Sequence, residues 1–141
     1  MSPITAALLS VGFLLALTRG APTNTDGASL PIRLSVENDL SNVPPEFYQT
    51  SVVEGGVLLG ALRRLQGMQR GFEFTVKEDP DLGLLIESVN RVAGNKHAQT
   101  YWEILSESSG VQSRLDVGVG CYRPRADEHI ILRFSTWKPQ E

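Results

Sequence analysis

The side chains that could perform chemistry are few in this chain and lie far apart in the sequence. There is one cysteine, Cys121, and there are two histidines, His97 and His129. Covalent catalysis requires a nucleophile, a base and an orienting group, and neither the Gly-x-Ser-x-Gly nor the His-Glu-x-x-His spacing occurs. His97 lies in a polar segment, which predicts exposure, and His129 opens an apolar run, which predicts a structural or edge position rather than a metal ligand. These residues favour a protein that is not an enzyme.

An acidic cluster and two glycine-containing segments are the remaining candidates. The acidic residues around Pro80 are Glu78, Asp79 and Asp81. A solvated turn is a better interpretation of them than a calcium loop, because calcium takes more oxygen ligands than this cluster offers. The segments 82–84 and 117–120 lack the strand-to-helix placement of a phosphate-binding loop. They could instead bring bare backbone, flanked by large apolar side chains, up to a flat ligand.

Composition limits the class of protein further. The chain has 141 residues, a formal net charge of −3 and no concentrated basic segment, which predicts one domain and makes nucleic acid an unlikely partner. A single cysteine excludes an internal disulfide framework, a cysteine-rich zinc site and a Cys-x-x-Cys pair. We expect Cys121 to be a small buried side chain on a strand; the alternative is an intermolecular disulfide.

The N-terminal segment predicts the compartment. Residues 4–17 are uncharged and mostly apolar, which is the length of a signal-peptide core and too short for a membrane-spanning helix. Small residues precede the predicted cleavage site after Gly20, although no Lys or Arg precedes the apolar segment. The alternatives to a signal peptide are an uncleaved membrane anchor or a buried helix. We therefore predict a signal peptide over 1–20, a flexible leader over 21–30 and a secreted, extracellular protein.

Hydrophobic periodicity predicts one helix among several strands. Alternating or β-branched runs predict strands at 32–36, 47–53, 72–76, 82–89, 101–106, 115–122 and 129–137. Apolar residues recur at helical spacing only over 57–68. This order indicates an α+β, β-grasp-like single domain over 31–138, with a mixed sheet of several strands and one packed helix.

Several of these segments resemble the C-terminal β-domain of the cobalamin carriers, the family of intrinsic factor, transcobalamin and haptocorrin. The resemblance is carried by TYWEILS at 100–106, LDVGVGCY at 115–122 and EHI at 128–130. Upstream, it extends to the helix at 57–68 and to LGLLIESVN at 82–90, so that it covers about residues 31–137. It implies that the chain is a transcobalamin-like protein.

The resemblance also implies a ligand and a binding site. The family holds cobalamin between a helical barrel and this β-domain, whose matching positions here are Asp81, Leu82, Gly83, Leu84, Leu85, Ile86, Trp102, Glu103, Ile104, Leu105, Ser106 and Leu115. Trp, Leu and exposed backbone suit a corrin, which is apolar on its faces and ringed by amides. Trp102 has two interpretations at this point, either a ligand-facing indole or a core indole on a buried strand face.

Departures from the family pattern shape the functional hypothesis. No counterpart of the helical barrel precedes the domain, Glu103 stands where the family has Gln, and the turn over 107–114 is longer and lacks its Pro. An ionised Glu103 cannot donate the hydrogen bond of an amide. We therefore expect a secreted module that binds cobalamin or a related corrinoid weakly, or together with a helical partner or a second copy. The alternative is an extracellular protein-interaction module that has lost the vitamin.

Overall fold

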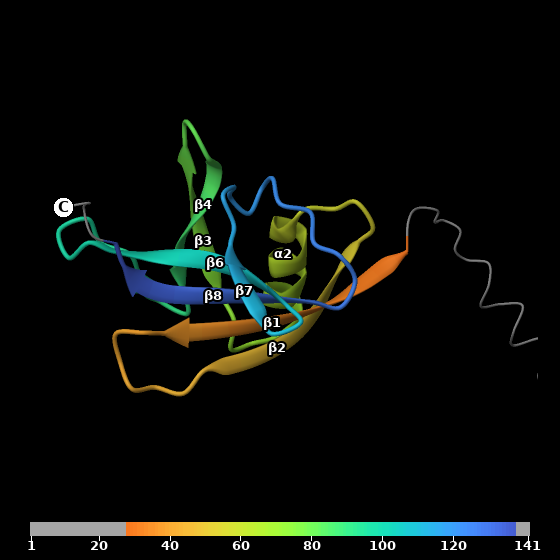
Figure 1. Cartoon of the computed structure of the whole chain (residues 1–141), viewed down its shortest axis with the longest axis horizontal. Helices are drawn as coiled ribbons and strands as arrows, with labels where there is room; N and C mark the ends of the chain where they lie inside the picture. Colours follow the sequence, from red (N-terminus) through yellow and green to blue (C-terminus); the bar gives the residue numbers. More distant parts are fainter. Residues whose placement is uncertain (1–27, 138–141) are drawn as a thin grey trace, which may run out of the picture.

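The computed structural model describes residues 28–137, and its largest element is a five-stranded sheet. The strands lie in the order β2 (Glu46–Val53), β1 (Ser29–Asn38), β8 (Glu128–Thr136), β6 (Thr100–Ser108) and β7 (Val111–Arg114) (Figure 1). Strands β1 and β8 pair in parallel, and the other neighbours are antiparallel, so the sheet is mixed. The predicted signal peptide at 1–20 lies outside the described residues.

One helix, α2 (Leu58–Met68), packs against this sheet. Its buried side chains recur at helical spacing and face the core: Leu58, Ala61, Leu62 and Leu65. The Thr50 hydroxyl of β2 donates a hydrogen bond to the Ala61 carbonyl at 2.9 Å, which fixes the helix over that strand. The helix predicted over 57–68 is confirmed.

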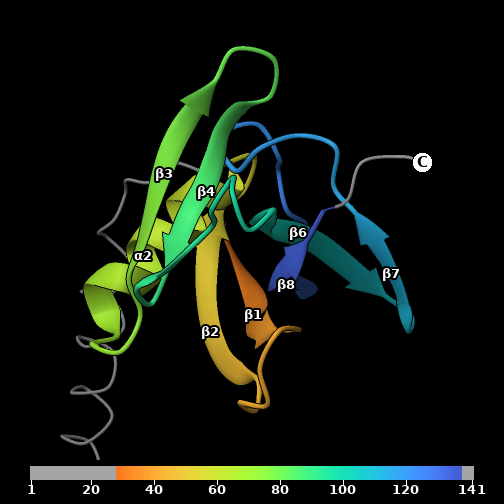
Figure 2. The same cartoon turned by 90° about the vertical axis from the view of Figure 1, so that its left-hand side faces the viewer.

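A second, three-stranded sheet follows the helix. It contains β3 (Phe74–Asp79), β4 (Gly83–Val89) and β5 (Val92–Ala93), all antiparallel. The β3–β4 hairpin extends beyond the large sheet, and its tip is the uppermost point of the described chain in both views (Figures 1 and 2). The predicted α+β class with one helix on a mixed sheet is confirmed, and the separate small sheet is an addition that the sequence did not predict.

The hydrophobic core lies between the large sheet, the helix and the small sheet. Alternate residues of the central strands are almost fully buried there, among them Ile32 and Leu34 on β1 and Ile130 and Leu132 on β8. Helix and small sheet contribute Leu62 and Val89 to the same cluster. Burial of such side chains stabilises the fold by about 1.5–3 kcal/mol each.

The prediction of a strand over 115–122 was wrong. The edge strand next to β6 is β7, which precedes that segment. β6 and β7 form a hairpin whose turn residues Ser109 and Gly110 have φ of 51° and 81°. Residues 115–122 instead form a loop that crosses to the small sheet. The prediction that Cys121 is buried on a strand was wrong for the same reason, because the residue is exposed in this loop.

Candidate functional site

A hollow lies between the small sheet and the edge of the large one. It has a volume of about 510 Å³, within the range of small-molecule sites. Its walls come from three stretches of the chain: residues 77, 82 and 85–87 of the β3–β4 hairpin, residues 94–96 and 100–104 before and in β6, and residues 114–118 at the end of β7 and in the loop that follows. Trp137 lines it from the end of β8. We call this hollow the inter-sheet cavity.

Three predicted segments converge on the inter-sheet cavity. The predicted site residues that line it are Leu82, Leu85, Ile86, Trp102, Glu103, Ile104 and Leu115. They come from the start of β4, from β6 and from the loop after β7, which are well separated in sequence and adjacent only in the fold. The lining combines aliphatic and aromatic side chains with a few charged groups, as ligand sites for flat apolar molecules do.

The other predicted site residues lie elsewhere. Asp81 is exposed in the β3–β4 turn, and Gly83 and Leu84 line a separate, shallower hollow at the base of that turn. Leu105 is buried but lies outside the main core cluster, because successive residues of a strand point to opposite faces. Ser106 donates a hydrogen bond to Glu128, away from the cavity.

Trp102 is a core residue with one side on the cavity. Only 6% of its surface is exposed, and its ring packs on Phe134 with centroids 5.1 Å apart. The indole Nε1–H donates to the Val92 carbonyl at 2.8 Å, which joins β6 of the large sheet to β5 of the small one. Of the two interpretations left open by the sequence, the core indole describes most of its surface.

Several cavity residues were not predicted from the sequence. Trp137 is 42% exposed, and Tyr101 and Arg114 lie on β6 and β7. The Arg114 guanidinium donates to the Tyr101 hydroxyl at 2.8 Å and lies 3.9 Å from the Glu103 carboxylate. Burial raises the pKa of Tyr101. Tyr101 and Arg114 adjoin the predicted residues Trp102 and Leu115 in the sequence, but the family segments did not single them out. Trp137 reaches the cavity only through the pairing of β8 with β6.

One wall of the cavity is a loop attached by its backbone. The Gly118 and Val119 amides donate to the carbonyls of Leu82 and Leu84 on β4, at 3.2 and 3.0 Å. A Cβ atom on Gly118 would lie 2.0 Å from the Leu84 oxygen, so only glycine fits. That the glycines of 117–120 bring bare backbone up to a ligand stays a prediction: Gly118 lines the cavity, while its amide is bonded to the Leu82 carbonyl.

The same loop completes the start of the helix. The Leu58 amide donates to the Tyr122 carbonyl at 2.7 Å, and the Leu59 amide donates to the Val119 carbonyl at 2.9 Å. The residue before the helix, Val57, provides no side-chain cap. Loop carbonyls therefore satisfy amides that a helix leaves without partners at its start.

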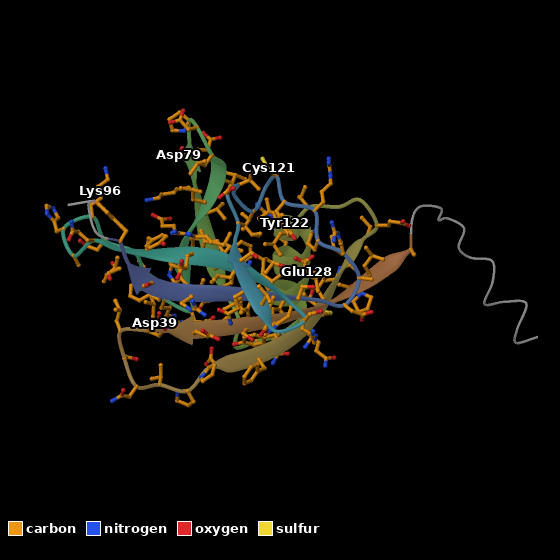
Figure 3. All side chains as sticks on the ribbon, viewed as in Figure 1. Asp39, Asp79, Lys96, Cys121, Tyr122 and Glu128 are labelled. Carbon is orange, nitrogen blue, oxygen red and sulfur yellow. The ribbon has the colours of Figure 1, made fainter. Side chains whose placement is uncertain are left out.

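Glu128 anchors the far end of this loop. Its carboxylate accepts hydrogen bonds from the Ser106 hydroxyl, from the Tyr122 hydroxyl at 2.5 Å and from the Arg125 amide at 2.7 Å. Figure 3 shows Tyr122 of the loop near Glu128 at the start of β8. Burial and the hydrogen bond to Glu128 raise the pKa of Tyr122.

Three side chains on the opposite face of the large sheet have the order of a proton relay. The Ser35 hydroxyl lies 2.6 Å from His129 Nε2, and His129 Nδ1 lies 2.6 Å from the Glu107 carboxylate. The Ser35 side chain is completely buried, which leaves a substrate no access to its hydroxyl. These groups bridge β1, β8 and β6, so His129 is structural as predicted, although its strand is central rather than at an edge.

The acidic cluster is a turn, as predicted. The Asp79 carboxylate accepts hydrogen bonds from the amides of Asp81 and Leu82 at 2.8 and 2.9 Å, which lowers its pKa. Figure 3 shows Asp79 at the tip of the hairpin. Over residues 28–137 there is no group of three or more His, Cys, Asp and Glu side chains placed to hold a metal ion. Nor does that part of the chain contain a helix long and apolar enough to span a membrane.

Comparisons with known proteins connect this sequence and fold to one group of proteins. No family model matches the sequence. The chain is 32% identical over 120 residues to cobalamin binding intrinsic factor of Canis lupus familiaris, and 33% identical over 119 residues to those of Mus musculus and Homo sapiens. These alignments cover 82–83% of this chain and 27–28% of the relatives, so the chain spans a little over a quarter of their length.

Solved structures agree on the class of domain. Haptocorrin in complex with Cbi superimposes with a TM-score of 0.66 at 25% identity, covering 86% of this chain and 28% of that one. A candidate metal binding protein from Ruminococcus gnavus has a TM-score of 0.56 at 12% identity and shows the fold alone, over 99% of its length. The class is an α+β domain of the haptocorrin type. Sequence and fold together are those of the C-terminal β-domain of the cobalamin-carrier family, as the motifs indicated.

Proposed function

We propose that the chain is a corrinoid-binding module that takes cobalamin or a related corrinoid at the inter-sheet cavity. The observation that carries the proposal is the convergence of the three cobalamin-carrier segments, represented by Leu82, Trp102 and Leu115, on one hollow of about 510 Å³. The relatives are named for binding cobalamin, which supports the same class of ligand for this chain.

The cavity suits part of a corrinoid rather than the whole molecule. Aliphatic residues such as Leu85 and Ile104 offer contact to an apolar macrocycle face, whereas Glu103, Arg114 and Asn95 offer hydrogen-bonding groups to its amides. A volume of about 510 Å³ encloses only one side of so large a ligand. We expect micromolar or weaker affinity for the chain alone, about −8 kcal/mol at best.

A titration of the purified chain with aquocobalamin, followed by absorbance and calorimetry, tests the proposal. The variant Leu85→Trp fills the cavity and should abolish saturable binding, whereas Val43→Trp places the same side chain on an exposed loop and should leave binding unchanged. Absence of binding at high micromolar vitamin, or equal binding by both variants, would contradict the proposal.

We also propose that binding improves with a partner, either a helical cobalamin-binding protein or a second copy of the chain. The one-sided cavity supports this, because a corrinoid held on one side leaves its other face free for a second protein surface. Sedimentation of the chain with and without aquocobalamin distinguishes the two, because a second copy would double the mass at saturation. An unchanged mass together with micromolar affinity would exclude the second copy and favour the helical partner.

Secretion is the last part of the proposal, and it rests on the uncharged apolar segment at 4–17 followed by small residues up to Gly20. We expect expression in a secretory cell line to release a protein whose first residue is Ala21. Recovery of the chain inside the cell with Met1 retained would contradict it.

A further inference from the structure

Three exposed apolar side chains from separate elements line the inter-sheet cavity. Leu82 at the hairpin tip is 45% exposed, Val117 in the loop is 42% exposed, and Trp137 at the end of β8 is 42% exposed. Each lines the cavity and each leaves a large part of its surface in water. Exposed apolar side chains gathered at the rim of one hollow indicate a contact surface.

The two tryptophans of the chain have different environments at this cavity. Trp102 has its ring against Phe134 and its Nε1–H bonded to Val92, so little of the indole remains for a ligand. Trp137 is positioned by its backbone, whose amide donates to the Gln99 carbonyl at 2.9 Å, while its indole stays accessible. An accessible indole with a fixed backbone is well suited to pack on a flat ring.

We infer that Trp137 is the aromatic anchor of the site, against which the flat face of the ligand packs, and that Trp102 supports the wall behind it. The inference rests on the proposed corrinoid function and adds a specificity-determining residue to it. Leu82 and Val117, which line the same cavity, add apolar contacts from the hairpin tip and the loop. The ligand class favoured by these three side chains is a broad, flat molecule with an apolar face, which a corrin macrocycle provides.

Calorimetric titration of four proteins with aquocobalamin tests the inference: the unmodified chain, Trp137→Ala, Trp137→Phe and Phe47→Ala. We expect Trp137→Ala to weaken affinity about tenfold or more and Trp137→Phe to recover most of the loss, because the phenyl ring retains the aromatic face. Phe47 is a matched control, since it is an aromatic side chain that is 71% exposed on β2 and does not line the cavity. Its replacement should leave the affinity unchanged.

The outcomes separate this inference from the proposed function. Binding by the unmodified chain with equal affinity in Trp137→Ala would overturn the role of Trp137 and leave the corrinoid function standing. Absence of binding by the unmodified chain would overturn both. Circular dichroism and the thermal midpoint of each variant show whether it is folded, and a folded Trp137→Ala protein is expected because the replaced indole lies at the surface. If Trp137→Ala fails to fold, Trp137→Leu replaces it, because leucine keeps an apolar side chain without the aromatic face. Equal affinity in folded Trp137→Leu and in Phe47→Ala would then overturn the inference.

Discussion

The two sheets of this domain are held in place by different means. The large sheet has continuous pairing from β2 to β7 and buries alternate residues of its central strands against the helix. The small sheet packs Ile86 and Val89 into the same core but is hydrogen-bonded to the rest of the domain at few points. These include the Trp102–Val92 bond and the bonds from the loop amides of Gly118 and Val119 to the carbonyls of Leu82 and Leu84. The cavity lies at this junction, so its shape depends on few hydrogen bonds whereas the large sheet depends on many.

Replacing the indole at the junction should have the largest effect. Trp102→Ala removes a core side chain and leaves the Val92 carbonyl without its donor, so we expect a loss of about 3–5 kcal/mol in the free energy of unfolding. Urea denaturation measures it. The exposed Trp137→Ala is the matched control and should change stability by less than about 1 kcal/mol. Equal losses in the two variants would refute the contrast between the two tryptophans.

Gly118→Ala tests the backbone half of the junction. The added Cβ would overlap the Leu84 oxygen at 2.0 Å, so the loop must leave β4, and we expect a loss of about 3 kcal/mol. Gly120→Ala in the same loop makes an ordinary contact of 3.5 Å with Leu84 and should be nearly neutral. Hydrogen exchange of the β4 amides should accelerate in Gly118→Ala alone; unchanged exchange would show that the loop does not hold the small sheet.

The anchor of the loop at Glu128 gives a pH-dependent prediction. The pKa of Tyr122 is raised in the folded state, so its hydroxyl contributes stability that is complete below about pH 10 and is lost as pH rises through the raised pKa. Tyr122→Phe should cost about 1.5 kcal/mol at neutral pH and should reduce the loss of stability in alkaline solution. Denaturation curves between neutral and strongly alkaline pH measure both, and parallel pH profiles for the two proteins would count against the prediction.

The smallest effect concerns the small sheet alone. Arg91 has φ of 72° in the turn between β4 and β5, where glycine is unstrained, and its ion pair with Glu73 is largely exposed. Arg91→Gly should therefore stabilise the domain by up to about 1 kcal/mol and leave corrinoid affinity unchanged. Thermal unfolding beside Arg70→Gly, an exposed arginine outside both sheets, provides the comparison. A lower thermal midpoint for Arg91→Gly would contradict it.

Local patterns in the sequence were sufficient for most of the elements and for the class of fold. Alternation at 32–36 and helical spacing at 57–68 correspond to β1 and α2 because each pattern records which side of one element faces the core. The segment 115–122 misled the prediction, since Val117-Gly118-Val119-Gly120 alternates like a strand although its amides pair with β4 over two residues only. Alternation shows that a segment can bury one face, and it does not identify the partner that covers it.

The sequence by itself determined the helix, the main strands and the segments that the cobalamin carriers share. Only the tertiary structure decided that Leu82, Trp102 and Leu115 line one cavity while Leu105 faces away from it. It also decided that Trp102 belongs to the core and that Trp137 stays accessible. The physical reason is that an indole satisfies the same hydrophobic pattern in a core or at a rim, and its burial is set by strands that are distant along the chain.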